Sequence, residues 1–206
     1  MWRMMQEVYQ MQHTIISQAD AKISAISPSS ESQKHTLMSL ITELGFLHSS
    51  LASWVDAYKN YVRSLHSWLQ KWVVQPRDHS RGRKLTLSPR RHLAPPLFVL
   101  LGDWSAGMSL LQSEESCDSI KNLATDLKKM CKQRAAKKRS SDTGAEDKAA
   151  EHDKSENEAK LATLQGGLTT MFDRLSKLSD AMASLSENVK REAEIAQETY
   201  NGQRKL

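Results

Sequence analysis

The sequence of 206 residues contains little glycine and proline, with 8 and 5 residues respectively. Sheets need frequent turns that rely on these two residues, so their scarcity argues against a β-rich fold. Cysteine is scarcer still, since only Cys117 and Cys131 occur. Both are expected in one helix, roughly 21 Å apart along its axis, which excludes a disulfide between them. We expect two reduced thiols, as is usual in cytosolic and nuclear proteins.

Long hydrophobic runs are also absent. The longest covers residues 97–101, whereas about 18 apolar residues in succession are needed to span a bilayer. The first seven residues become polar too soon for a signal peptide, and position 2 is not the glycine that N-myristoylation requires. We therefore expect no membrane-spanning helix, secretory leader or myristoyl group.

Motifs of catalysis and metal binding are missing as well. The seven histidines do not pair at the i, i+4 spacing of metal ligands, and neither C-x-x-C nor a glycine-rich phosphate loop occurs. Acidic pairs such as Glu114 and Glu115 lie in polar segments, where nothing would desolvate their carboxylates. His48, which interrupts an apolar track, is expected to be partly buried and hydrogen-bonded. We expect no catalytic, cofactor-binding or metal-binding residue and predict that the chain is not an enzyme.

What the chain does contain is a strong seven-residue repeat over residues 33–74. One track reads Leu37, Leu44, Leu51, Tyr58, Leu65 and Trp72, a second reads Leu40, Leu47, Trp54, Tyr61 and Trp68, and a third adds Ile41, Val55, Val62 and Leu69. Three adjacent tracks make an apolar face wide enough for a helix that packs against two or more neighbours. Such a helix would be roughly 60 Å long. The residues expected to anchor the core are Trp54, Tyr58, Tyr61, Leu65, Trp68 and Trp104.

Other segments also carry helical patterns. Trp2, Met5, Tyr9 and Ile16 recur at helical spacing before a break at residues 27–30 that contains a proline. A third helix restarts near Pro96, with a potential interruption at residues 113–116, and a last one shows two leucine-rich tracks over residues 161–189. The pattern predicts an all-α fold, an extended bundle of about four long antiparallel helices with coiled-coil-like heptad packing.

Composition divides the chain into three parts. Residues 1–139 are predicted to form the N-terminal portion of the bundle, with a basic loop at residues 75–95. Residues 140–158 are almost free of large apolar side chains and are predicted to form a flexible polar linker. Residues 159–200 are predicted to form a C-terminal heptad helix that packs on the bundle.

The chain has a net charge of +5, and its basic residues are concentrated in two places. The first lies near the end of the third helical segment, where Lys128, Lys129, Lys132, Arg134, Lys137, Lys138 and Arg139 occur without an acid. Three interpretations of this basic segment are open: a solvated helix end, a nuclear import signal, or a face that contacts the phosphates of a membrane or a nucleic acid. The second is the loop, where Ser88 is followed by proline and resembles a proline-directed phosphorylation site. Arg90 and Arg91 are the predicted partners of a phosphate on Ser88.

Four stretches together resemble a known domain. They are residues 1–12, residues 54–69 with Trp54-Val55-Asp56-Ala57-Tyr58, residues 88–108 with Ala94-Pro95-Pro96-Leu97-Phe98-Val99 and Asp103-Trp104-Ser105, and residues 164–172 with Leu164-Gln165-Gly166-Gly167-Leu168. In this order they resemble the plant-specific domain of unknown function, of the DUF632 type, that forms the C-terminal part of nitrate regulatory gene 2 proteins. The sequence begins inside that domain, which implies a truncated product or a short paralogue.

The resemblance implies a regulatory role in nitrate signalling in the nucleus, through protein partners that are signalling or transcription regulators. It implies no catalytic residue and no cofactor. Relatives are labelled as basic-leucine-zipper-like, but no basic region abuts a zipper in this chain, so sequence-specific DNA binding is not expected. The favoured hypothesis is a non-enzymatic helical protein-interaction module in the nucleus or cytoplasm. The alternative is a peripheral scaffold that binds anionic lipid at the plasma membrane, and self-association stays open.

Overall fold

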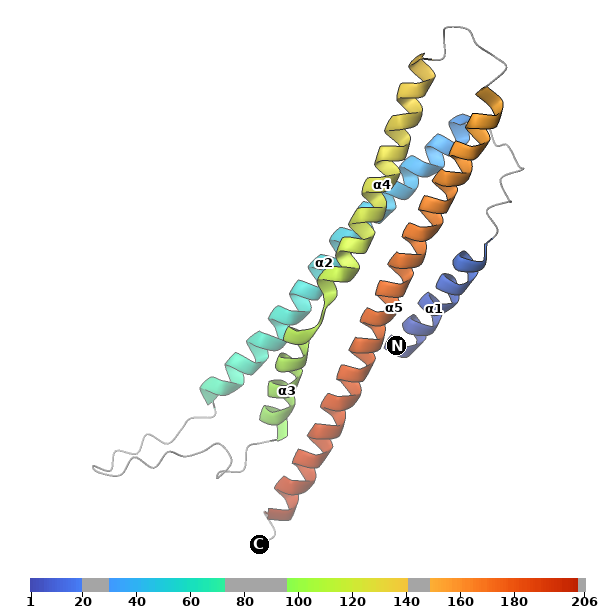
Figure 1. The fold of residues 1–206 in the computed structure, drawn as a ribbon. Coiled ribbons are helices and arrows are strands. Elements are labelled where there is room, and N and C mark those ends of the chain that lie inside the picture. The colour runs from blue at the N-terminus through green and yellow to red at the C-terminus, as the bar shows by residue number, and fades with distance from the viewer. Residues whose placement is uncertain (20–29, 73–95, 141–148, 204–206) are drawn as a thin grey trace. The chain divides into compact units, whose positions relative to one another are not determined.

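The computed structural model describes residues 1–19, 30–72, 96–140 and 149–203. These residues form five helices, which are α1 (Trp2–Gln18), α2 (Ser30–Trp72), α3 (Pro96–Leu110), α4 (Ser113–Ser140) and α5 (Ala149–Gln203). No strand occurs within the described ranges. The prediction of an all-α helical bundle is therefore confirmed (Figure 1).

The predicted third helix is broken in two, slightly before the expected position. Helix α3 ends at Leu110 and α4 begins at Ser113, because Ser113 followed by Glu114 and Glu115 is a favourable first turn for a new helix. Helix α3 begins at Pro96, whose fixed φ and missing N–H suit the first helical position.

Helix α5 begins earlier than the sequence suggested. It starts at Ala149, so the second half of the predicted linker at residues 140–158 is helical. Residues 149–160 are rich in alanine, glutamate and lysine, which favour helix even where no apolar face is available.

The chain divides into two compact units that do not follow the linear order of the sequence. Unit 1 comprises Met1–Ser53 and Gln112–Asp180, and unit 2 comprises Trp54–Leu111 and Ala181–Leu206. Helices α2 and α5 contribute one part to each unit. Two of the boundaries therefore fall inside α2 and α5, where composition gives no signal, and the third lies between α3 and α4. None of them lies at the basic loop or at the polar segment that composition predicted as divisions of the chain.

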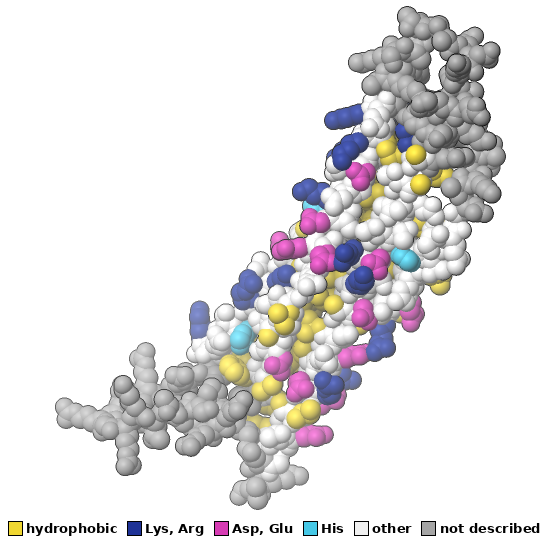
Figure 2. All heavy atoms as spheres, viewed as in Figure 1, with side chains coloured by type: hydrophobic (Ala, Val, Ile, Leu, Met, Phe, Trp, Pro, Cys, Tyr) yellow, Lys and Arg dark blue, Asp and Glu magenta, His cyan; other side chains and the backbone are white. Residues whose placement is uncertain are grey.

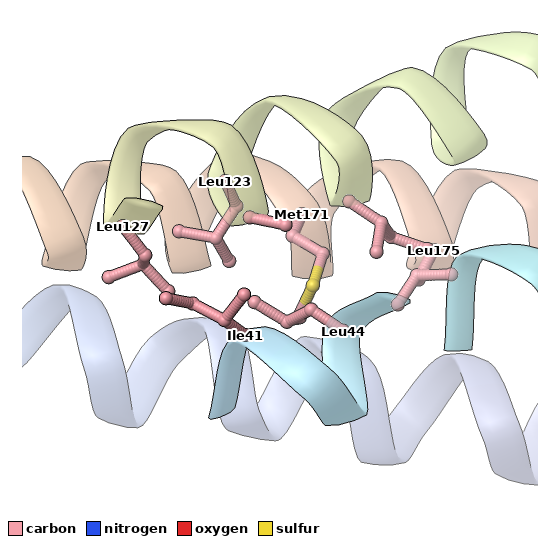
Figure 3. Close-up of a cluster of buried hydrophobic side chains, with 8 residues drawn as sticks. Ile41, Leu44, Leu123, Leu127, Met171 and Leu175 are labelled. Atoms are coloured by element: carbon pink, nitrogen blue, oxygen red, sulfur yellow. The ribbon is translucent and has the colours of Figure 1, made fainter. Parts of the chain in front are cut away.

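The core of unit 1 lies between α2, α4 and α5. Its buried side chains are Ile41, Leu44, Ile120, Leu123, Ala124, Leu127, Met171 and Leu175, and those labelled in Figure 3 point toward one another from the three helices. Within this unit α4 and α5 run in opposite directions (Figure 1).

Polar contacts add specificity to the packing of α4 on α5. The buried Ser116 hydroxyl donates a hydrogen bond to the carbonyl of Arg174 at 3.1 Å, and the Arg174 side chain forms an ion pair with Glu115. Gly167 permits a close approach, since a Cβ atom there would lie 2.7 Å from the Cδ1 atom of Leu123. Gly167, the second residue of the Gly166-Gly167 pair, therefore lets α4 and α5 pack closely at this point.

Helix α1 is held on α5 by hydrogen bonds from side-chain amides. Gln165 Nε2 donates hydrogen bonds to the carbonyl of Ile16 at 2.7 Å and to that of Ala19 at 3.0 Å, which satisfies acceptors at the end of α1. Gln6 Nε2 donates to Asp180 Oδ1 at 3.0 Å, and the Tyr9 and Phe172 rings lie 6.2 Å apart. No residue of α1 is fully buried, so this helix lies at the edge of the unit.

Unit 2 has its own set of buried apolar residues. They are Val55, Val62, Leu101, Met108, Leu111, Met182, Ala183 and Val189. Gly107 of α3 lies directly against Leu185 of α5, so that a Cβ atom at this position would overlap the leucine side chain. Gly107 therefore lets α3 approach α5 closely.

Candidate protein-interaction surface

An aromatic cluster joins α2 to α3 in unit 2. The Trp54 and Tyr58 rings are stacked with centroids 5.4 Å apart, and Tyr58 meets Trp104 edge-to-face at 5.7 Å. Burial raises the pKa of the Tyr58 hydroxyl above 10.0; a hydrogen bond with Trp104 acts in the opposite direction, and Tyr61 adds a smaller increase. The cluster therefore has one partly desolvated ring at its centre and one exposed ring at its edge.

A groove of about 700 Å³ opens beside this cluster. Tyr58, Leu100 and Trp104 line one side of it, and α5 supplies the other side with Ser186, Val189, Lys190, Ala193, Glu194, Gln197 and Glu198. We call this feature the unit 2 groove. Its walls are mainly apolar, while its rim carries two glutamates and one lysine, with Lys190 Nζ 3.8 Å from Glu194 Oε1.

The predicted core anchors do not all lie in the core. Tyr58, Leu65 and Trp104 are half-buried, but Trp54 is 38% exposed, Tyr61 57% and Trp68 55%. The prediction that these last three residues are core anchors is therefore wrong. They belong to the second track of α2, which leads away from the core.

The reason lies in helix geometry. An α-helix of 3.6 residues per turn drifts by about 20° per heptad relative to a strict seven-residue repeat. Successive members of the second track therefore rotate away from the buried side of α2, which carries Val55 and Val62 of the third track. The result is a row of large, exposed aromatic side chains on α2, a composition that is common at the centre of protein interfaces.

The start of α3 is only partly buried. Phe98 is half-buried and its ring centroid lies 5.8 Å from that of His66, but Leu97 is 52% exposed. Leu97 therefore does not anchor the entry to α3, whereas Phe98 and Trp104 do contact α2. His48 is half-buried, as predicted.

The predicted phosphorylation site at Ser88 and its partners Arg90 and Arg91 lie outside the described residues. The basic segment is described in part: Lys128, Lys129 and Lys132 are exposed on α4, and Lys129 Nζ lies 3.1 Å from Asp126 Oδ1. The side chains of Arg134, Lys137, Lys138 and Arg139 are outside the described set. On the face seen in Figure 2, basic and acidic side chains are interspersed, and no field of a single sign gathers there.

The described residues contain no group of three or more His, Cys, Asp or Glu side chains that could hold a metal ion. A second groove, of about 430 Å³, lies between α1 and α5 in unit 1 and is lined by polar side chains, where Lys177 pairs with Asp173 at 2.7 Å. Asp180, which also lines this groove, accepts a hydrogen bond from Gln6 Nε2 at 3.0 Å.

None of the described helices combines the length and the apolar character needed to cross a membrane.

Comparison with known proteins gives one match. Residues 1–129 match the family model described as protein of unknown function (DUF632), and this range includes three of the four stretches that carry the resemblance. Searches of curated proteins and of solved structures found no match. Because the matched range covers more than half of the 206 residues, the chain belongs to the DUF632 family.

Proposed function

We propose that this chain is a non-enzymatic helical protein-interaction module, and that the unit 2 groove is its binding site. The observation that carries the proposal is the apolar groove that Tyr58, Leu100 and Trp104 line on one side, with the exposed Trp54 ring stacked on Tyr58. Tyrosine and tryptophan contribute large contact areas at a small cost in conformational entropy, and they dominate the binding energy of many interfaces.

The chemistry of the groove favours an amphipathic helix of a partner protein. An apolar channel between helices accepts the apolar face of such a helix. Small-molecule sites usually contain several convergent polar groups, whereas the exposed lining of this groove is mainly apolar. Since Glu194 and Glu198 outnumber Lys190 there, the partner helix should carry basic residues along the edges of its apolar face.

The resemblance to nitrate regulatory gene 2 proteins supports a regulatory setting for this binding. In this proposal the partners are signalling or transcription regulators in the nitrate response, met in the nucleus or cytoplasm of a plant cell. A fluorescent fusion of the full chain, imaged before and after nitrate supply, tests the setting. Exclusion from the nucleus under both conditions would contradict a nuclear role.

Binding at the groove is tested with a fluorescent helical peptide that has a leucine stripe and lysine edges. Ala193→Trp would fill the groove without a change of charge, and Ala181→Trp, at an exposed position of the same helix outside the groove lining, is the matched control. We expect Ala193→Trp to weaken peptide binding by at least about tenfold and Ala181→Trp to leave it within about twofold. Equal affinity for all three proteins, or a preference for glutamate edges, would contradict the proposed occupant.

The exposed basic residues favour a second candidate function, a peripheral scaffold that binds anionic lipid. Lys128, Lys129 and Lys132 are exposed on α4, and each lysine near an anionic surface contributes about 1 kcal/mol. Co-sedimentation with phosphatidylserine vesicles at increasing salt should then show binding that declines with ionic strength, and phosphatidylcholine vesicles serve as the control. No binding to anionic vesicles at low salt would remove this candidate.

A further inference from the structure

Helix α1 carries an apolar face that unit 1 leaves uncovered. Met1, Met4, Val8, Met11 and Ile15 are between 49% and 82% exposed. We call this set the α1 outer stripe. The opposite side of the helix, with Tyr9 and Ile16, is half-buried against unit 1, so the stripe is distinct from the surface that holds α1 in place.

The spacing of the stripe is that of a coiled-coil seam. Met1, Val8 and Ile15 recur at seven residues, and Met4 and Met11 fall between them at the same interval. Written as heptads, the first three occupy a positions and the other two occupy d positions. The inward-facing set and this outward-facing repeat therefore lie in the same short segment, which comprises Met1 and the seventeen residues of α1.

We propose that the α1 outer stripe is a self-association surface that packs against the same stripe of a second copy of this chain. Three observations favour a second copy as the occupant: the charge of the helix, the area of the stripe and the way in which α1 is fixed. The proposal concerns unit 1 alone and is independent of the unit 2 groove.

The charge of α1 permits contact with its own copy. Arg3 and Glu7 carry its only formally charged side chains, apart from a histidine, and neither belongs to the stripe. Two identical faces of uncharged side chains do not repel each other, whereas like charges in direct contact would oppose pairing. The same scarcity of lysine and arginine argues against a membrane as the occupant, because membrane-surface helices use basic residues to reach anionic lipid.

The area is sufficient for a pair. The stripe exposes on the order of 500 Å², a size at which apolar patches on proteins are usually functional. Two copies would bury on the order of 1,000 Å² in total, which reaches the lower limit of specific interfaces.

Helix α1 is already fixed before any association. The hydrogen bonds from Gln165 to the carbonyls of Ile16 and Ala19 and from Gln6 to Asp180 hold it on α5. A helix of 17 residues is marginal alone, but one held in this way loses little conformational entropy on pairing. Methionine at three of the five positions allows two copies of one surface to adapt to each other.

The test measures the mass of the purified full chain by light scattering and sedimentation, from about 1 to about 200 µM. We expect a monomer–dimer equilibrium. Val8→Lys, which places a charge in the stripe, should raise the dimer dissociation constant by at least about tenfold. Gln10→Lys adds the same charge two residues away, at an exposed position outside the stripe, and should leave the dissociation constant within about twofold.

A second variant separates pairing from folding. Met11→Leu keeps the stripe apolar and should preserve the dimer, and circular dichroism should show the same helix content in all variants. A monomer at every concentration would overturn the proposal, as would a dimer that Val8→Lys leaves intact. Binding of the wild-type monomer to phosphatidylcholine vesicles, abolished by Val8→Lys, would also overturn it, because the stripe would then be a lipid surface.

Discussion

Unit 1 and unit 2 use the same long helices in different ways. In unit 1, α2, α4 and α5 enclose a continuous apolar core, and Ser116 and Gln165 tie neighbouring helices together through hydrogen bonds to backbone carbonyls. In unit 2 the aromatic residues of α2 are exposed or half-buried, and one of them, Tyr58, lines an open groove. Apolar side chains stabilise the fold where they are enclosed, and they remain available for binding where they are not.

The largest expected contrast is between one buried leucine and one exposed tryptophan. Leu127→Ala in unit 1 should lower the free energy of unfolding by about 2–5 kcal/mol, because it leaves a cavity in an enclosed core. Trp68→Ala in unit 2 should lower it by less than about 1 kcal/mol, since the tryptophan is already more than half exposed. Urea denaturation of both variants gives the values, and an equal loss would show that the aromatic row is buried in solution.

A smaller effect is expected within the aromatic cluster. Trp104→Ala removes the half-buried partner of Tyr58 and should cost about 1–3 kcal/mol. Trp54→Ala removes only a stacked, more exposed ring and should cost less, on the order of 0.5–1.5 kcal/mol. Thermal denaturation of the two variants compares them. The reverse order would mean that the stacked pair, and not the edge-to-face pair, holds α2 and α3 together.

The adjacent glycines of α5 provide a matched pair in unit 1. A Cβ atom at Gly166 would meet nothing within 4 Å, so Gly166→Ala should stabilise the protein by about 0.5–1 kcal/mol through helix propensity. Gly167→Ala places a methyl group against Leu123 and should cost about 1 kcal/mol, because overpacking outweighs the same propensity gain. Chemical denaturation should give opposite signs. Equal stabilisation by both would mean that Leu123 moves aside without loss.

The smallest expected effect is on the stability of the fold at alkaline pH, to which one tyrosine in each unit should contribute. Burial raises the pKa of Tyr9 in unit 1 and of Tyr58 in unit 2 above 10.0. A raised pKa of an acid favours the protonated folded state, so this stability is complete below pH 10.0 and is lost as pH rises through the folded pKa. Tyr9→Phe and Tyr58→Phe should each reduce the loss of stability seen above pH 10.0. An unchanged alkaline slope in either variant would mean that the ring concerned is not desolvated in solution.

The sequence predicted which residues are helical better than it predicted which face is buried. The repeats of α2 and α5 predicted both long helices. The repeat of α2 does not distinguish the exposed Trp54, Tyr61 and Trp68 from the buried Val55 and Val62. All five positions fit an apolar heptad pattern, and the drift of the helix relative to that pattern separates them only when neighbouring helices fix the buried direction. The groove could not be predicted for the same reason, since the α5 residues that line it are about 80 to 140 residues away in the chain from those of α2 and α3.

By itself, the amino-acid sequence determined the helical class, the lack of catalytic motifs among its residues and the presence of more apolar surface than one bundle seam requires. Local propensity and periodicity suffice for these properties, because they depend on residues that are close in the chain. Only the tertiary structure decided that α2 and α5 are shared between two units, that Gln165 caps α1, and that the α1 outer stripe and the aromatic row of α2 are exposed. An apolar side chain is buried only where another helix covers it, and which helix covers it depends on contacts between residues that are distant in the sequence.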